Sequence, residues 1–348
     1  MLLLRIILFP LSPLYRWVIW LRNYLFDRGI YKSEKVDAKV ISIGNITVGG
    51  SGKTPAVILV TDILKKAGKK VGVLSRGYGR RSKGYRLVSE GSEIQTEVSA
   101  CGDEIYLTAM ECSVPAAVSE KRVQGARRLI EDTDVEVIVL DDAFQHRWID
   151  RDLNILVFDN SFLLKSGGMD QNLLPVGLMR EPFSAVRRAD AVIVNRKFSG
   201  IGFLPPQLRL YFEKKKVFYA FYRTAGFFDV KSRSYYDVQD FTGQKSLVIS
   251  GIANPLSFLN VLRQASIDTE NQLIFRDHKD YTLRDIQDIR KAFYATNSQS
   301  VITTQKDAVK LSRFSKELDD IDIYYLKIEM DIENRAEFEE FLLNKIEV

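Results

Sequence analysis

One short segment constrains the fold more than any other part of the chain: GNITVGGSGKTP, from Gly44 to Pro55. A β-branched apolar run, 40–43, precedes it, and an apolar segment, 56–67, follows it. This order predicts a strand, a glycine-rich loop and a helix, with the loop amides at the amino terminus of the helix, where phosphate groups bind. The alternative is a glycine-rich turn that contains Gly-Lys-Thr by chance.

The loop carries the groups that a nucleotide phosphate site requires. Lys53 can reach the terminal phosphates, the hydroxyl of Thr54 can hold Mg²⁺, and the glycines supply converging amides. Thr47 stands where the generic G-x-x-x-x-G-K-[ST] pattern has its first glycine. The predicted phosphate-binding residues are Thr47, Val48, Gly49, Gly50, Ser51, Gly52, Lys53 and Thr54.

Composition excludes several classes of protein. A chain of 348 residues with 46% hydrophobic and 27% charged residues is typical of a folded soluble protein, and its length favours two domains. Cys101 and Cys112 form neither a disulfide framework nor a metal-spaced set, which favours a reducing compartment. The net charge of +5 fits a phosphorylated or anionic-membrane partner but not nucleic acid, which requires a stronger basic footprint.

The first thirty residues differ from the rest of the chain. They are rich in leucine, isoleucine and aromatic residues, yet arginines interrupt them and Pro10 and Pro13 argue against a single helix. The longest charge-free run, 6–15, is too short to span a bilayer, and no signal-peptide cleavage site follows. The mixture of aromatic residues and arginines predicts a membrane-interface segment over 1–30, and a helix packed on the protein's own core is the alternative.

Buried strands alternate with helical patterns after the loop, which predicts a parallel sheet wrapped by helices. The aromatic segment 217–238 lacks a helical period and reads as a two-stranded connector, and a second α/β rhythm follows it. We therefore predict an α/β protein with a P-loop NTPase-type domain and a smaller α/β domain. The predicted ranges are 1–30 for the membrane segment, 31–215 for the nucleotide-binding domain, 216–240 for the connector and 241–348 for the second domain.

Two aspartates end one of the predicted strands. Asp141 and Asp142 follow the apolar run 137–140, where an acidic residue commonly holds Mg²⁺ opposite the threonine of a phosphate loop. In isolation, a helix cap or turn would be the preferred interpretation of this pair. The chain has only two histidines, His146 and His278, and His278 follows a predicted strand of the second domain, where ligands commonly bind.

Eight motifs follow one another along nearly the whole chain: GNITVGGSGKTP, SRGYGRR (75–81), CGDE (101–104), LDDAFQHR (140–147), LLPVGLMREP (173–182), SGIANP (250–255), DHKDYT (277–282) and TTQKDAVKL (303–311). In this order they resemble the tetraacyldisaccharide 4′-kinase family, the membrane-associated lipid A kinases of Gram-negative bacteria. The phosphate loop alone is not specific, whereas the combination of DDAFQHR, REP and a late DH is.

The resemblance implies transfer of the γ-phosphoryl group of ATP, with Mg²⁺, to the 4′-hydroxyl of an acylated glucosamine disaccharide 1-phosphate at the cytoplasmic face of the bacterial inner membrane. It places activation of the hydroxyl on Asp103 and His278, and the alternative for Asp103 is a helix N-cap. It places Asp141 and Asp142 near Mg²⁺ and the reacting phosphate. It also makes Arg180 and Glu181 active-site residues; the weaker candidates are Arg76, Tyr78 and Arg122.

Two positions depart from the family pattern. Lys279 replaces a second histidine after the DH pair, and Gln305 replaces an acidic residue in the TTEKDAV-like segment. Two other functions stay open on the sequence: a membrane-associated GTPase or ATPase switch, and a nucleotide-binding adaptor without chemistry. The segments that begin at Asn195 and Thr304 do not match the N-K-x-D pattern of guanine recognition, which disfavours a GTPase.

Overall fold

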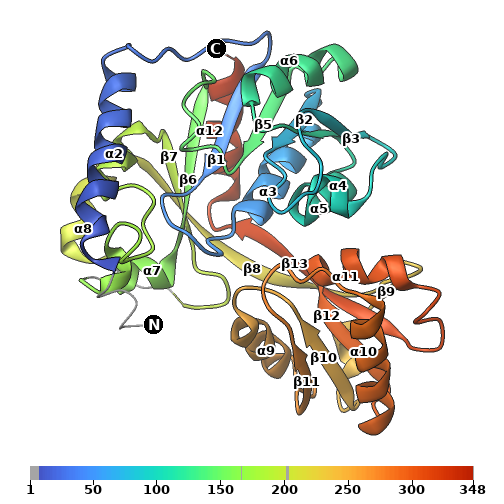
Figure 1. Cartoon of the computed structure of the whole chain (residues 1–348). Coiled ribbons are helices and arrows are strands. Elements are labelled where there is room, and N and C mark those ends of the chain that lie inside the picture. The colour runs from blue at the N-terminus through green and yellow to red at the C-terminus, as the bar shows by residue number, and fades with distance from the viewer. Residues whose placement is uncertain (1–7, 166, 201–203, 348) are drawn as a thin grey trace.

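The computed structural model describes residues 8–165, 167–200 and 204–347. These residues form a mixed α/β fold around one large, mostly parallel sheet, with helices on both of its faces (Figure 1). The α/β class predicted from the alternation of apolar runs and helical patterns is confirmed.

The first half of the sheet is built around the strand that leads into the phosphate loop. Its strands pair in parallel, apart from β3 at the edge, which is antiparallel to its neighbour β4. In spatial order they are β7 (Ala191–Asn195), β6 (Leu153–Asp159), β1 (Lys39–Gly44), β5 (Val137–Asp141), β2 (Val71–Ser75), β4 (Pro115–Val118) and β3 (Arg86–Glu90).

The second half of the sheet contains three further parallel pairings. Its strands are β11 (Asn271–Ile274), β10 (Ser246–Ser250), β12 (Ser300–Thr304) and β13 (Ile323–Ile332). The long strand β8 (Lys216–Asp229) joins the halves, because it runs parallel to β7 and antiparallel to β13. The short β9 (Tyr235–Tyr236) pairs with β8 as the predicted connector requires, but β13 is the more extensive partner of β8.

Both faces of the first half are buried, which explains its continuous apolar strands. One face packs on α3 (Lys53–Lys66), α5 (Asp103–Cys112) and α12 (Arg335–Glu347), whose Phe338 and Leu342 are fully buried. The other face packs on α6 (Arg122–Thr133) and on the segment that contains α7 (Asn160–Leu164) and α8 (Pro206–Phe212). The last helix of the chain therefore packs on the first half of the sheet.

The second half has two hydrophobic clusters of its own. One lies under α10 (Leu283–Ala295) and α11 (Gln305–Leu311), and the other under α9 (Pro255–Gln264). Parallel strands of both halves end toward the same cavity, so the loops that follow β1, β5, β10 and β12 can meet there.

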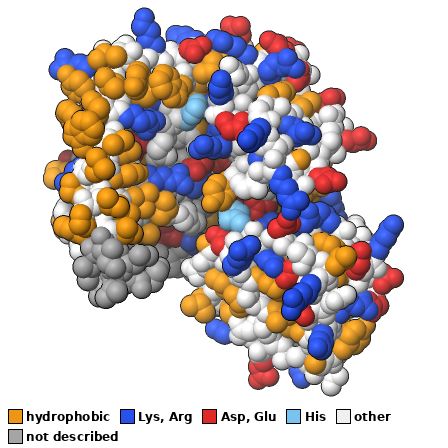
Figure 2. Space-filling model, in the orientation of Figure 1, with side chains coloured by type: hydrophobic (Ala, Val, Ile, Leu, Met, Phe, Trp, Pro, Cys, Tyr) orange, Lys and Arg blue, Asp and Glu red, His pale blue; other side chains and the backbone are white. Residues whose placement is uncertain are grey.

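Helix α2 (Leu11–Asp27) lies on the outside of the first half (Figure 1). Pro10 directly precedes it and Pro13 lies in its first turn, where no intrahelical N–H bond is lost, so the prolines mark its start rather than a break. Apolar side chains gather over this helix on the surface (Figure 2), and those exposed by a third or more are Leu11, Leu14, Trp17, Val18, Trp20 and Tyr24. Among the described residues, no helix has the length and apolar character needed to cross a bilayer.

The apolar runs behind the predicted sheet correspond to strands, although β13 extends six residues beyond its run, 323–326. The run 71–75 matches β2 fully, and 153–158 differs from β6 by one residue. The edge strand β3 and the short helices α4 (Val98–Cys101), α7 and α8 have no clear periodic signal and were not predicted. Residues 1–7 of the predicted membrane segment lie outside the described residues.

Candidate active site

The phosphate loop runs from the end of β1 to the start of α3. Gly52 has a left-handed backbone with φ of 97°, and a Cβ there would come within 2.2 Å of the Asn195 amide nitrogen. The same amide donates to the carbonyl oxygen of Ser51 at 3.0 Å, while the Asn45 amide donates to the Ser51 hydroxyl at 3.0 Å. Asn45 and Asn195 therefore fix the loop, and glycine is required at position 52 for the close approach.

A second segment braces the loop from outside. The amide of Val48 donates to the carbonyl oxygen of Leu178 at 2.7 Å. The amide of Arg180 donates to the carbonyl oxygen of Ile46, also at 2.7 Å. Thr47 forms an isolated β-bridge with Met179. The LLPVGLMREP segment thus pairs with the phosphate loop, which the order of motifs along the chain does not show.

Lys53, Asp142 and Arg180 meet at the mouth of the loop. The Lys53 ammonium lies 3.8 Å from an Asp142 carboxylate oxygen, and one Arg180 nitrogen contacts both oxygens of that carboxylate at 3.1 and 2.9 Å. Asp142 has a left-handed backbone with φ of 46°, which turns the chain after β5. The structure therefore brings together three predicted residues from separate motifs, with two cations around one carboxylate.

Asp141 lies behind this group and is almost fully buried. The Ser75 hydroxyl lies 3.4 Å from one of its carboxylate oxygens, and the other oxygen has no hydrogen-bond partner among the described residues. Burial and the negative charges of Glu104 and Asp142 raise the pKa of the Asp141 carboxyl. A buried, partly unpaired carboxylate at the end of β5 and the buried hydroxyl of Thr54 at the start of α3 are oxygen ligands of the kind that Mg²⁺ prefers.

Asp103 and His278 come together although they lie 175 positions apart in the sequence. His278 Nδ1 lies 3.1 Å from Asp103 Oδ2. Asp103 starts α5 after Gly102, whose φ is 95° and where a Cβ would come within 2.8 Å of the Tyr78 carbonyl oxygen. His278 also has a left-handed backbone, with φ of 54°. The structure therefore forms the predicted Asp–His pair from the two halves of the sheet.

The pKa values of this pair move apart. Burial opposes ionisation of Asp103, but the hydrogen bond with His278 and the charges of Lys306 and Lys310 hold its pKa well below the usual range. The hydrogen bond to Asp103 outweighs partial burial and raises the pKa of His278 above its usual value. His278 is 31% exposed and lines the cavity, whereas Asp103 is 5% exposed and lies behind it.

A cavity of about 1110 Å³ joins these groups. The phosphate loop, Asp142 and Arg180 line it from the first half of the sheet, and His278 and Lys306 line it from the second half. The phosphate loop and His278 therefore line the same cavity, which has room for a second substrate.

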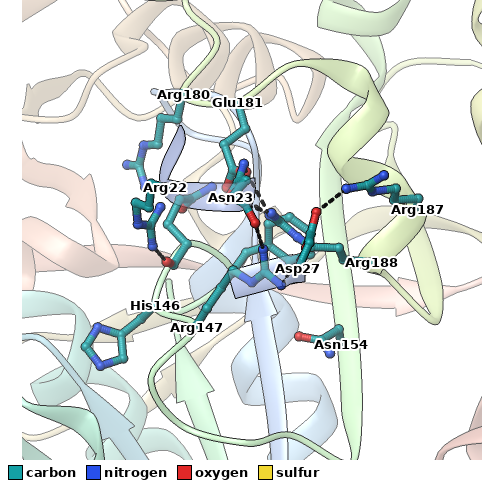
Figure 3. A network of polar contacts seen from close by, with 12 residues as sticks. Arg22, Asn23, Asp27, His146, Arg147, Asn154, Arg180, Glu181, Arg187 and Arg188 are labelled. Atoms are coloured by element: carbon teal, nitrogen blue, oxygen red, sulfur yellow. Dashed lines mark hydrogen bonds and ion pairs between the residues drawn. The ribbon is translucent and has the colours of Figure 1, made fainter. Parts of the chain in front are cut away.

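Glu181 points away from the cavity. It is fully buried, and its carboxylate accepts two hydrogen bonds from Arg188, at 2.9 and 2.8 Å, and one from Asn23 of α2 at 2.8 Å (Figure 3). The Tyr15 hydroxyl of α2 donates to the carbonyl oxygen of Arg180 at 3.0 Å. We call this set of contacts the α2 network; it comprises Arg22, Asn23, Asp27, Arg147, Glu181, Arg187 and Arg188.

One of the weaker candidates, Arg122, and the two departures from the family pattern have defined polar contacts. Arg122 is buried and donates to the backbone carbonyls of Ser119 and Asp141, at 2.7 and 3.4 Å. Lys279 forms an ion pair with Asp285 at 2.7 Å, and Gln305 donates to Glu111 at the same distance. Each departing residue therefore has a polar partner of its own.

Sequence reasoning missed three residues of the site. Asn195, which orders the phosphate loop, ends β7 and was considered only as part of a guanine-recognition pattern. Lys306 and Lys310 lie one helical turn apart in TTQKDAVKL and contact Glu104 and Asp103, at 2.7 and 2.9 Å. The i,i+4 spacing of two lysines on one helix was the available signal.

The fold and the site define a P-loop nucleotide-binding α/β protein with an Asp–His pair opposite the phosphate loop. Residues 4–347 match the family model described as "Tetraacyldisaccharide-1-P 4'-kinase". The chain belongs to this family.

Relatives that carry the name tetraacyldisaccharide 4′-kinase match most of the chain. That of Desulfatibacillum aliphaticivorans is 34% identical over 97% of this chain and 91% of its own. That of Aquifex aeolicus is 35% identical over 90% of this chain and 91% of its own. A solved structure of Aquifex aeolicus LpxK in complex with ATP superposes with a TM-score of 0.80 at 31% identity and covers 99% of both chains.

Proposed function

We propose that this chain transfers the γ-phosphoryl group of ATP to the 4′-hydroxyl of a tetraacyldisaccharide 1-phosphate, the reaction of lipid A 4′-kinases. The observation that carries the proposal is the Asp103–His278 pair, which lies across one cavity from the phosphate loop. A nucleotide-binding switch has no use for a carboxylate–imidazole pair at an acceptor site, whereas a kinase needs a group to take the hydroxyl proton.

The phosphate loop and two cations provide binding and charge stabilisation for ATP. The loop amides and Lys53 hold the phosphates, and Arg180, on the opposite side of Asp142, adds a second positive charge near the transferred group. Phosphoryl transfer depends mainly on positioning and electrostatics, so these residues lower the barrier without forming a covalent intermediate.

Thr54 and Asp141 are the residues proposed to hold Mg²⁺. Both are buried at the end of the phosphate loop and of β5, and one Asp141 oxygen has no hydrogen-bond partner among the described residues. When bound, Mg²⁺ neutralises negative charge on the phosphates. Burial raises the pKa of Asp141, and a cation held there would favour its ionised form.

Asp103 and His278 act together on the acceptor. As the 4′-hydroxyl oxygen bonds to the γ-phosphorus and the bond from phosphorus to the ADP oxygen breaks, the hydroxyl proton passes to the pair. The imidazole faces the cavity and the carboxylate lies behind it, so His278 is the nearer group to the acceptor.

The exposed apolar face of α2 is proposed to lie in the membrane interface at the cytoplasmic face of the inner membrane. Trp17 and Trp20 are 55% and 57% exposed, and such residues favour the headgroup region of a bilayer. The opposite face of α2 contacts the REP and DDAFQHR segments through the α2 network. A docked helix would thus place the active site beside a substrate whose acyl chains stay in the bilayer.

The domain division stays as proposed from the sequence, with nucleotide binding in 31–215, a connector in 216–240 and an acceptor-side domain in 241–348. Separate hydrophobic clusters in the two halves of the sheet support this division. Helix α12 packs on the first half and so ties the end of the chain to the nucleotide side.

The experiment that tests the function uses γ-labelled ATP, Mg²⁺ and detergent-dispersed tetraacyldisaccharide 1-phosphate. Label in the lipid is expected, and the matched control is the same lipid with its 4′-position already phosphorylated, which should take none. Label only as free phosphate, with or without lipid, would favour a membrane-associated NTPase switch instead.

A further inference from the structure

The Asp–His pair has a third charged neighbour. Lys310 of α11 places its ammonium 2.9 Å from Asp103 Oδ2, the same oxygen that lies 3.1 Å from His278 Nδ1. The Lys310 side chain is 8% exposed. A lysine buried to this degree is rare unless it is paired, and its pairing here is with a carboxylate that faces the acceptor histidine.

Lys310 belongs to a set of contacts between α5 and α11 that we call the α5–α11 network; it comprises Asp103, Glu104, Glu111, Gln305, Lys306 and Lys310. Three polar side chains of α11 each contact a carboxylate of α5 in this network. One function of such a row is to hold the two halves of the sheet together. Holding the halves together requires polar pairs between α5 and α11. It does not require Lys310 to contact the same Asp103 oxygen as His278.

The charges around His278 come from every element packed against it. Asp103 and Glu104 lie on α5, Lys306 and Lys310 lie on α11, and Asp277 adjoins His278 in the chain. The Tyr78 ring packs edge-on against the imidazole at 5.4 Å. Among these groups only Asp103 comes within hydrogen-bonding distance of Nδ1, and Nε2 lies 4.0 Å from Asp277.

This geometry fixes the tautomer of the neutral ring. An ionised Asp103 accepts only, so Nδ1 must carry the hydrogen that it donates, and Nε2 keeps a lone pair. A protonated Asp103 could instead donate to Nδ1 and place the ring hydrogen on Nε2, where it would block proton uptake. The nearby Lys310 ammonium favours the ionised carboxylate.

We propose that Lys310 is a positioning residue for phosphoryl transfer: it anchors the Asp103 carboxylate that fixes the Nδ1–H tautomer of His278, and its charge keeps the ring neutral, so that Nε2 can take the acceptor proton. The inference rests on the proposed kinase function. In the step, the O–H bond of the acceptor breaks and an N–H bond forms at Nε2, while the oxygen bonds to phosphorus and ADP leaves. The imidazolium then releases the proton to water.

Lys310 also affects the pKa of His278 directly, and this effect determines the direction of the shift expected in the test. The Lys310 ammonium and His278 Nδ1 contact the same Asp103 oxygen, so the positive charge of Lys310 lies close to the ring and disfavours the imidazolium. Replacing Lys310 by a neutral residue should therefore raise the pKa of His278 further. Below that pKa the ring is already protonated and cannot accept, so activity should fall most on the acid side.

The first measurement is independent of activity. The chain has two histidines, so ¹⁵N-histidine labelling gives two sets of ring signals, which His146→Gln assigns. In Lys310→Met the pKa of His278 should rise by about one pH unit relative to wild type, as expected for loss of one close charge. Lys310→Arg, which keeps the charge, should leave it near the wild-type value. An unchanged pKa in Lys310→Met would overturn the proposal.

The second measurement is kcat/KM for phosphoryl transfer from about pH 5.5 to about pH 9, across the titration of histidine. The acid limb should move upward in Lys310→Met by the same shift, about a tenfold loss at its acid end, with recovery at alkaline pH.

The matched control for this measurement is Lys327→Met. This change removes an ion pair of 2.6 Å between Lys327 and Glu111, which lies on α5 as Asp103 does. It should not shift the acid limb of the pH profile. A loss that is equal at all pH values and shared by both variants would mean that Lys310 only bridges the halves. Absence of label transfer in wild type would instead refute the kinase function and leave the titration result standing.

Discussion

The surroundings of the two histidines differ in a way that separates two tasks in this molecule. Burial and the charges of Arg122, Arg151 and Arg22 lower the pKa of His146 to about 4. The hydrogen bond to Asp103 raises the pKa of His278. Near neutral pH, His146 is therefore an uncharged ring in an arginine-rich region, whereas the hydrogen bond to Asp103 favours the protonated form of His278.

The two networks explain the difference. In the α2 network, arginines outnumber carboxylates, and their contacts hold the loop after β5 and the REP segment against α2. In the α5–α11 network, lysines and carboxylates pair, and one carboxylate also bonds the histidine. The first network positions backbone segments, while the second determines where a proton resides.

The largest expected effect comes from removing the ammonium group of the phosphate loop. Lys53→Ala should lower phosphoryl transfer by about 10³-fold, because a preorganised charge on the transferred phosphate is lost. The assay is label transfer at saturating lipid. Lys66→Ala, at an exposed lysine of the same helix α3, is the control and should retain activity. A folded Lys53→Ala protein with near wild-type transfer would remove Lys53 from the mechanism.

The next effect acts on the α5–α11 network. Asp103→Ala should lower kcat by about 10²-fold, the lower end of the usual contribution of proton transfer to a positioned group, while ATP still binds. It should also lower the pKa of His278, because the hydrogen bond that raises it is lost. Activity close to wild type in a folded variant would mean that the pair does not act on the acceptor.

A smaller effect is expected in the α2 network. Glu181→Gln weakens two charged hydrogen bonds to Arg188 in a buried site, so the unfolding free energy should fall by about 3 kcal/mol. Its pH profile should keep the acid limb of wild type, because Glu181 does not contact His278. Thermal unfolding and the pH profile measure the two effects. Asp280→Asn, which removes an exposed ion-pair partner, should change stability by less than about 1 kcal/mol.

A shift of the acid limb of the pH profile in Glu181→Gln would contradict the separate roles of the two networks. It would show that the α2 network also sets the protonation of the acceptor histidine. A stability loss no greater than that of Asp280→Asn would show that the buried carboxylate does not anchor the REP segment.

The smallest effect on chemistry concerns the outer face of α2. Replacing Trp17 and Trp20 by serine should reduce binding to vesicles of anionic phospholipid by about tenfold or more, with little change in the unfolding temperature, because both side chains are largely exposed. Sedimentation with vesicles measures the binding. Leu283→Ser, at an exposed apolar residue of α10, is the control. Equal binding of all three proteins would contradict a membrane-docking α2.

Local patterns predicted the strands of the first half and the phosphate loop because each is encoded by adjacent residues. The run 137–140 followed by two aspartates already indicated β5 and its acidic end. The different roles of these aspartates were not predictable, because Asp142 faces Lys53 and Arg180 while Asp141 is buried behind it. The resemblance to a family, rather than any local pattern, paired Asp103 with His278.

Other features depend on contacts between distant segments. Nothing near Glu181 in the sequence shows that its carboxylate accepts from Asn23, and nothing near Lys310 shows that it reaches Asp103. The pairing of β8 with β13 likewise joins residues about a hundred positions apart. Such contacts are set by the packing of the whole sheet, which single-sequence periodicity does not describe.

The most direct test of the central claim compares transfer of labelled γ-phosphate from Mg·ATP to detergent-dispersed tetraacyldisaccharide 1-phosphate in wild type, Asp103→Ala and His278→Ala. We predict a labelled lipid product with wild type and a loss of orders of magnitude in both variants, although each still binds ATP. Full transfer by either folded variant would contradict the assignment of the acceptor proton to the Asp103–His278 pair.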